Sequence, residues 1–170
     1  APFANLYFQF HLWDEIGWQG VKAVMEAAIA AKYKHCDSVR LWKAKCEDEG
    51  VRLVCKFLQN SKSVNVLELL DAELTTLGCE FLSQTLHSSA EVPLLVLKLD
   101  HNPIGAAGMK ALAQGLSMNK TLELVSLTYC SIDKEGANSL FEIVIYTQSG
   151  LKELNVTGNL LGDEGVVKVL

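Results

Sequence analysis

Residues 94–116 read LLVLKLDHNPIGAAGMKALAQGL and contain one complete structural unit. Leucines alternate in the first part, as they do in a strand that buries one face. The second part places apolar residues at helical spacing, and an asparagine with a glycine-rich run separates the two parts. One strand and one helix cannot bury their apolar sides alone. The stretch therefore predicts that similar units precede and follow it.

The same pattern recurs along the chain at a nearly constant period. The glycines near the start of each predicted helix are Gly20, Gly50, Gly78, Gly108, Gly136 and Gly165, which lie 30, 28, 30, 28 and 29 residues apart. Alternating apolar pairs precede them, such as Leu67 with Leu69 and Leu97 with Leu99. A strand followed by a helix, repeated at this period, predicts a parallel sheet with its helices stacked side by side.

This pattern resembles that of the leucine-rich repeat proteins. A period of 28–30 residues with a full helix is similar to the ribonuclease-inhibitor-like subclass, and the resemblance covers residues 36–170 well and 14–30 in part. It implies an α/β fold: a right-handed solenoid, or horseshoe segment, with a parallel sheet on its concave face and helices on its convex face. The subclass also includes the sensor regions of NOD-like receptors, Ran GTPase-activating proteins and axonemal proteins, so the pattern encodes packing rather than a particular partner.

The repeats predict a single solenoid over residues 14–170. Its six expected repeats are 14–35, 36–63, 64–93, 94–121, 122–150 and 151–170, the last of them truncated and without a polar cap, from which we expect a longer array. Residues 1–13 have two interpretations. Alternation of Phe8, Phe10 and Leu12 favours a native N-terminal strand or cap. Residues 5–9 spell NLYFQ, part of an engineered cleavage tag, which favours the remnant of a tag.

The corner between each strand and its helix is filled by different residue types. In chain order the corner residues are Ala44, Ala72, Asn102, Cys130 and Asn159. An asparagine amide can both donate and accept hydrogen bonds, whereas alanine can do neither. We therefore expect a looser or water-bridged corner in repeats 36–63 and 64–93. Thr75, Asp133 and Asp163 are predicted to cap or begin their helices.

Composition excludes several classes of function. The net charge is −5, from 20 acidic and 15 basic residues, and no basic run is present, which argues against nucleic acid. No stretch approaches the roughly 18 apolar residues of a membrane span. No catalytic, metal-binding or phosphate-loop motif stands out. We therefore expect a protein that is not an enzyme and has no cofactor, no metal, no membrane contact and no small-molecule substrate.

Five cysteines occur without a C-x-x-C motif. An odd number of cysteines at such spacings predicts buried free thiols, which behave as small apolar side chains. Free thiols indicate a reducing compartment. We therefore expect a cytoplasmic protein, and the resemblance to axonemal members adds a cytoskeletal setting as one case.

Residues between and just after the two leucine positions of each strand are expected to point away from the core, onto the concave face. This concave-face set consists of Arg40, Trp42, Lys43, Glu68, Leu70, Asp71, Lys98, Asp100, His101, Thr128 and Tyr129. Tryptophan, tyrosine and arginine are common at the energetic centres of protein interfaces, and the mixed charges favour a protein partner. An alternative is that Trp42 and Leu70 only pack on each other across adjacent strands.

Two functional hypotheses follow. The first is a non-catalytic interaction scaffold that binds a protein partner of unknown identity on its concave sheet. The second is implied by the resemblance to Ran GTPase-activating proteins: a GTPase regulator with polar residues on one rim that steer the switch region of its partner.

Overall fold

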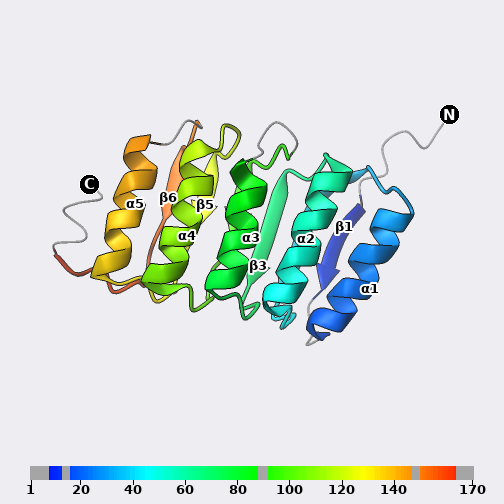
Figure 1. Ribbon diagram of the computed structural model, residues 1–170, viewed down its shortest axis with the longest axis horizontal. Coiled ribbons are helices and arrows are strands. Elements are labelled where there is room, and N and C mark those ends of the chain that lie inside the picture. Colours follow the sequence, from blue (N-terminus) through cyan, green and yellow to red (C-terminus); the bar gives the residue numbers. More distant parts are fainter. Residues whose placement is uncertain (1–7, 13–15, 88–91, 147–149, 164–170) are drawn as a thin grey trace.

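The computed structural model describes residues 8–12, 16–87, 92–146 and 150–163 of the chain. Strands and helices alternate along these ranges (Figure 1). The elements are β1 (Phe8–Leu12), α1 (Gly17–Ala30), β2 (Cys36–Trp42), α2 (Glu47–Ser61), β3 (Val66–Leu70), α3 (Thr76–His87), β4 (Val96–Lys98), α4 (Gly105–Met118), β5 (Leu124–Ser126), α5 (Lys134–Tyr146) and β6 (Glu153–Asn155).

The strands form one parallel sheet in which their order follows the chain. Six strands pair consecutively, from β1 to β6, and every pairing is parallel. The helices lie side by side over one face of the sheet (Figure 1). This arrangement confirms the predicted α/β solenoid, with the sheet on the concave face and the helices on the convex face.

The N-terminal segment contributes strand β1, which pairs with β2 through a register irregularity between Phe8 and Gln9. A paired strand is compatible with both interpretations of residues 1–13, which therefore stay predictions. Residues 1–7 and 13–15 lie outside the described residues, as do residues 164–170 of the last expected repeat.

The alternating leucine-type residues stack in register and form the floor of the core. Val39, Leu67, Leu97 and Val125 are successive partners across the sheet, and each is at most 1% exposed. The helices contribute the facing layer, which includes Met25, Phe57, Leu82, Leu112 and Leu140. Each such side chain stabilises the fold by about 1.5–3 kcal/mol, so the stacked repeats supply most of the stability.

The aligned glycines give room to the apolar side chain four residues before them. A Cβ atom at Gly136 would lie 2.6 Å from Ile132 Cγ2, and one at Gly50 would lie 2.7 Å from Cys46 Cβ. The apolar side chain two residues after the corner residue, such as Cys46 or Ile132, therefore lies under the first turn of the helix, where a residue larger than glycine would collide with it. The glycines thus recur at a nearly constant spacing because the same close packing recurs in each repeat.

Asn102 joins two repeats at the corner between strand and helix. Its Oδ1 atom accepts hydrogen bonds from the backbone N–H groups of Ala72 (2.9 Å) and Leu74 (3.1 Å) in the preceding repeat. Its amide nitrogen donates to the carbonyl groups of Leu69 (2.7 Å) and Leu99 (2.8 Å). The expectation of a looser corner in repeat 64–93 is therefore wrong, because the next repeat supplies the missing amide.

Asn159 performs the same task for the corner at Cys130. Its Oδ1 atom accepts from the N–H groups of Cys130 (2.9 Å) and Ile132 (3.0 Å). The thiol of Cys130 donates to Leu99 O at 3.2 Å. As an acceptor for the backbone of the preceding corner, at Asn102, a thiol sulfur is weaker than an amide oxygen. Each corner thus depends on the residue type at the following corner. Ala44 faces Ala72, which has no polar side-chain atom to offer.

Helix capping also crosses between repeats. Asp48 in α2 accepts hydrogen bonds from the N–H groups of Thr75 and Gly78, both at 2.9 Å, and from the Thr75 hydroxyl at 2.6 Å. Thr75 lies directly before the first residue of α3, as predicted for a helix start, and the side chain that caps α3 is that of Asp48. Asp133 caps its own helix as predicted, since its Oδ1 atom accepts from Gly136 N at 3.0 Å. The residues that follow Asp163, where a helix is expected, lie outside the described residues.

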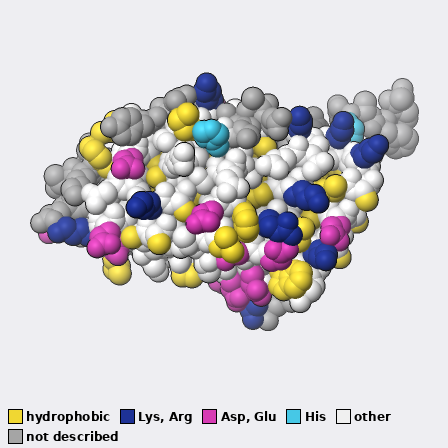
Figure 2. Space-filling model, viewed as in Figure 1, with side chains coloured by type: hydrophobic (Ala, Val, Ile, Leu, Met, Phe, Trp, Pro, Cys, Tyr) yellow, Lys and Arg dark blue, Asp and Glu magenta, His cyan; other side chains and the backbone are white. Residues whose placement is uncertain are grey.

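Figure 2 shows the helix-covered surface of the molecule. Acidic side chains gather at the lower edge of this view, beneath α2 and α3, where the strands end and these helices begin. The remaining surface carries scattered charges of both signs.

We expect Asn102→Ala to lower the free energy of unfolding by about 3 kcal/mol, because Asn102 is fully buried and its loss leaves backbone groups of two repeats unpaired. Urea denaturation followed by circular dichroism measures the change. Asn60→Ala is the matched control, since the Asn60 amide donates only one exposed bond to Lys56 O and its loss should change stability by less than about 0.5 kcal/mol. Equal effects of the two substitutions would contradict the role of Asn102.

Candidate functional site

The structure places the concave-face set in three rows along the sheet. In the central row, Arg40, Glu68 and Lys98 are successive partners across β2, β3 and β4. In the second row, Trp42 pairs with Leu70, and Asp100 and Thr128 lie at the corresponding positions after β4 and β5. The third row, here called the edge row, comes one residue after the second row in each repeat. It consists of Lys43, Asp71, His101 and Tyr129.

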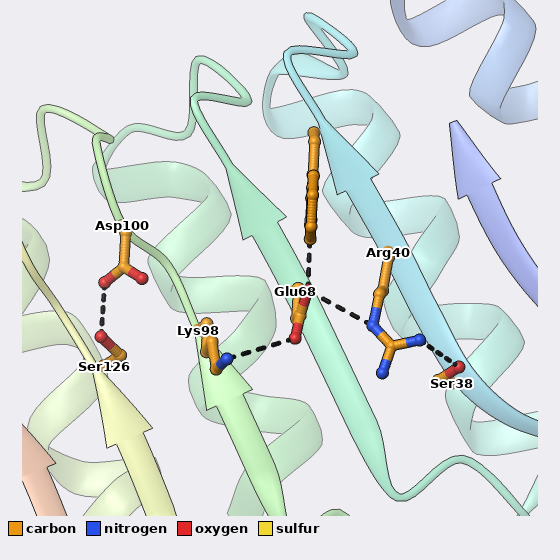
Figure 3. Close-up of polar contacts among 7 residues, drawn as sticks. Ser38, Arg40, Glu68, Lys98, Asp100 and Ser126 are labelled. Atoms are coloured by element: carbon orange, nitrogen blue, oxygen red, sulfur yellow. Dashed lines mark hydrogen bonds and ion pairs between the residues drawn. The ribbon is translucent and has the colours of Figure 1, made fainter. Parts of the chain in front are cut away.

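Glu68 is the centre of a polar network on the sheet. Its residue is 6% exposed, and one carboxylate oxygen accepts a hydrogen bond from Trp42 Nε1 at 2.9 Å. The same oxygen lies 3.3 Å from Arg40 Nε, and the other oxygen lies 3.4 Å from Lys98 Nζ (Figure 3). A buried carboxylate must be paired to be tolerated, and here two cations flank it.

Polar side chains in and beside this network also make contacts within the chain. Arg40 donates to Ser38 Oγ at 3.2 Å, and Asp100 accepts from the Ser126 hydroxyl at 2.6 Å (Figure 3). Asp100 also accepts from Thr128 N at 2.8 Å. The strand register predicts that Ser126 also points onto the concave face, whereas Ser38 was not identified from the sequence. Its outward register relative to the buried leucine-type residues was the signal that could have identified it.

The edge row has a shared backbone conformation. Lys43, Asp71, His101 and Tyr129 all have φ between 50° and 61°, in the left-handed region. Each donates its backbone N–H to the next repeat, for example Lys43 to Leu70 O at 2.8 Å and His101 to Thr128 O at 2.9 Å. The backbone of this row is therefore ordered by the stacking of repeats, and its side chains are the more exposed part of the face.

Two aromatic rings stack within the edge row. The rings of His101 and Tyr129 are 4.9 Å apart between centroids and 10° from parallel. Gly158, with φ of 74°, occupies the next position, and a Cβ atom there would lie 2.5 Å from the Tyr129 ring. Tyr129 thus lies between an imidazole and a glycine backbone, yet it is 57% exposed. The Tyr129 ring therefore offers a large area that is held in place by its neighbours and is accessible.

Trp42 and Leu70 form one wall of a hollow of about 390 Å³, which Lys43, Asp71 and His101 also line. Both apolar residues are half-buried. They are register partners, as the packing alternative requires, and the indole N–H is already bonded to Glu68. Trp42 is therefore ordered by its own repeat neighbours and also borders an open hollow, so the two interpretations are compatible.

These contacts divide the concave-face set into two parts. Arg40, Glu68 and Lys98 largely satisfy one another in the centre of the sheet. The exposed and half-buried side chains with unused binding capacity lie toward the edge row, around the Trp42 hollow and the stacked rings. The arrangement suits contact with another macromolecule, since it combines ordered aromatic area with a few charges.

All five cysteines are free and buried, as the sequence predicts. Desolvation by burial raises the pKa of Cys46, Cys55, Cys79 and Cys130 from about 9.0 to about 12. A thiol with so high a pKa is a poor nucleophile and a poor metal ligand at neutral pH. These four residues therefore act in packing.

Two further classes of site are not found among the described residues. No group of three or more His, Cys, Asp or Glu is arranged there to hold a metal ion. None of the helices in the described ranges combines the length and the apolar character that crossing a bilayer requires.

Comparison with known proteins places these features in a family. The Leucine Rich repeat family matches residues 93–113, 119–141 and 150–170. Ribonuclease inhibitor of Sus scrofa is 34% identical over 128 residues, which cover 74% of this chain and 27% of that protein. NACHT, LRR and PYD domains-containing protein 5 of Homo sapiens is 30% identical over 125 residues, covering 72% of this chain and 10% of that protein. The chain thus spans about a quarter or less of the length of these relatives.

A solved structure supports the same fold. The C-terminal domain of tropomodulin from Caenorhabditis elegans superposes with a TM-score of 0.67 at 13% identity, covering 88% of each chain. At this identity the similarity concerns the fold alone.

We expect Glu68→Ala to lower the free energy of unfolding by about 1–3 kcal/mol, because it leaves two cations and an indole N–H facing each other without their acceptor. Glu123→Ala is the matched control: its pair with Lys152 is exposed, so its removal should cost less than about 1 kcal/mol. Urea denaturation compares the two. A smaller loss for Glu68→Ala than for Glu123→Ala would contradict the network.

We expect the buried thiols to resist alkylation in the folded protein. A pKa of about 12 lowers the thiolate fraction about a thousandfold relative to a pKa of about 9, so iodoacetamide at about pH 8 should modify Cys55 only after unfolding.

The raised pKa also keeps the thiols neutral in the folded state while they ionise in the unfolded state. Folding stability should therefore fall as the pH rises from about 9 toward 12. Mass spectrometry and urea titrations at several pH values test both effects.

Proposed function

The chain belongs to the leucine-rich repeat proteins, with relatives of the ribonuclease-inhibitor type, and on this premise we propose that it is a non-catalytic scaffold that binds a protein partner on its concave sheet. The binding surface in this proposal is centred on Trp42, Leu70, His101 and Tyr129. The proposed setting is the cytoplasm, where five buried thiols remain reduced.

The observation that carries this proposal is the ordered, exposed aromatic edge of the sheet. Tyr129 is 57% exposed although its ring is stacked on His101. Trp42 is oriented by its bond to Glu68 beside an open hollow. Side chains that are already ordered lose little conformational entropy on binding, so few contacts suffice for useful affinity.

Charge supports a protein rather than a nucleic acid as the partner. The two best-ordered cations of the face, Arg40 and Lys98, already pair with Glu68. Nucleic-acid binding requires a cluster of cations that can contact phosphates. What remains exposed at the edge is a mixture of aromatic, apolar and oppositely charged side chains, including Lys43 and Asp71, which is typical of protein interfaces.

The alternative, a GTPase regulator, has no specific observation in its favour. It requires polar side chains on one rim that stabilise the transition state in a partner. The described rim at the ends of the strands is rich in carboxylates, which would repel phosphate. A GTP-turnover assay over small GTPases separates this alternative from the scaffold.

We expect Trp42→Ala combined with Tyr129→Ala to weaken capture of the partner about a hundredfold, because two anchors at the centre of an interface commonly contribute 1–2 kcal/mol each or more. The measurement is affinity capture from cell extract with identification by mass spectrometry, followed by a titration of the purified partner. Circular dichroism should show unchanged helical content.

Val144→Ala combined with Ile145→Ala is the matched control for this test. These residues are 42% and 52% exposed on α5, away from the concave face, and their loss removes a similar kind of surface. Partner binding that persists in the Trp42 and Tyr129 variant, or that is lost equally in the control, would refute the concave face as the binding surface.

A further inference from the structure

A second, larger hollow lies at the edge of the molecule where strands end and helices begin. Its volume is about 570 Å³, and it lies between the starts of α2 and α3 and the corners that precede α3 and α4. The hollow is lined by Glu47, Asp48, Glu49, Asp71, Glu73, Thr75, Leu77, Phe81, His101 and Pro103. It shares Asp71 and His101 with the Trp42 hollow, so the two form a continuous surface. We call it the rim hollow.

The rim hollow has an accessible apolar part. Leu77 in the first turn of α3 is 49% exposed, although it is a large aliphatic side chain. Phe81, one turn further along α3, is half-buried, and Pro103 is exposed on the neighbouring corner. An aliphatic chain or the methylene stem of a long side chain could cover this surface.

The charge of the rim hollow is strongly negative. Five of its lining residues are carboxylates, and none is lysine or arginine. Asp48 is used as the cap of α3, and Glu49 pairs with Arg52 at 2.6 Å. Glu47, Asp71 and Glu73 have no ion pair with any residue that the structure describes. The helix starts contribute roughly half a positive charge each, which offsets only part of this negative charge.

The three unpaired carboxylates stand on an ordered backbone. Glu47, Asp71 and Glu73 have φ of 52°, 50° and 59°. The N–H of Glu47 donates to Ala72 O, and that of Asp71 donates to Asp100 O, both at 3.0 Å. The backbone positions of Glu47 and Asp71 are therefore set by the stacking of repeats before any partner arrives. The acidic patch of Figure 2 lies in this region, next to exposed hydrophobic side chains.

We propose that the rim hollow binds a basic segment of the protein partner, with arginine or lysine over Glu47, Asp71 and Glu73 and an aliphatic side chain on Leu77 and Phe81. This proposal rests on the proposed function, since the segment belongs to the partner that contacts the adjoining concave face. Charge complementarity selects the occupant.

The other occupants fit less well. A second copy of this chain carries a net charge of −5 and would bring like charge to the hollow. A divalent cation requires several carboxylates converging on one point, and the described residues contain no such group.

The test uses two fluorescein-labelled peptides: one composed of arginine and leucine, and its counterpart with glutamate in place of arginine. We expect the basic peptide to bind, the acidic one not to bind, and Glu47→Gln combined with Glu73→Gln to weaken the basic peptide about fivefold. Neither residue belongs to the concave-face set. Leu77→Ala should weaken binding about threefold, in a manner that salt does not affect. Fluorescence anisotropy measures all of these affinities.

Glu135→Gln combined with Glu142→Gln is the matched control, because it removes two exposed carboxylates from α5, outside the hollow, and should leave peptide binding unchanged. Equal binding of both peptides, or an equal loss in the control, would overturn the proposal. Calcium that displaces the peptide at millimolar concentration, or self-association that Glu47→Gln with Glu73→Gln abolishes, would also overturn it in favour of those occupants.

The failure of this inference is distinguishable from that of the proposed function. If the purified partner loses affinity on removal of Trp42 and Tyr129 but not on neutralisation of Glu47 and Glu73, the concave face is retained and the rim hollow is rejected. If the partner is insensitive to Trp42 and Tyr129, the proposed function itself fails.

Discussion

An amide side chain at the corner of one repeat closes the corner of the repeat before it. Asn102 both accepts from Ala72 and Leu74 and donates to Leu69 and Leu99, so it links two strands and two turns with a single buried group. A corner in the interior cannot bond to water, and its backbone groups must find partners in the protein. Among the described corners, those at Ala72 and Cys130 are closed in this way by Asn102 and Asn159, and they directly follow the edge-row residues Asp71 and Tyr129.

This dependence on the neighbouring repeat extends to capping and to the sheet. Asp48 caps the helix of the following repeat, and each edge-row residue donates its backbone N–H to the following strand end. Such contacts act between adjacent units only, which is how a repeat protein accumulates stability. A substitution at one corner should therefore affect the corner before it. The backbone at Ala72 finds its partner in Asn102, whereas Ala44 is followed by alanine at the next corner.

The concave surface results from the same stacking. Alignment of β2, β3 and β4 brings Arg40, Glu68 and Lys98 into one row, and their charges satisfy one another. The side chains that remain exposed therefore lie at the edge of the sheet, where the chain turns and the rings of His101 and Tyr129 stack. The edge is also where the unpaired carboxylates lie, so an apolar and aromatic surface adjoins an acidic one.

The fold, the direction in which side chains point and the burial of the cysteines could be read from the sequence, because they depend on periods of apolar residues and on glycines at a constant spacing. Leu97 had to point into the core and Lys98 away from it once the strand was recognised. The contacts between outward-facing residues could not be read in this way. Trp42, Glu68 and Lys98 lie in three different repeats, and only the pairing of the strands brings them together. The same holds for Asp48 and Asn102, whose partners lie in a neighbouring repeat. Local pattern determines each unit, and the stacking of units determines the surface.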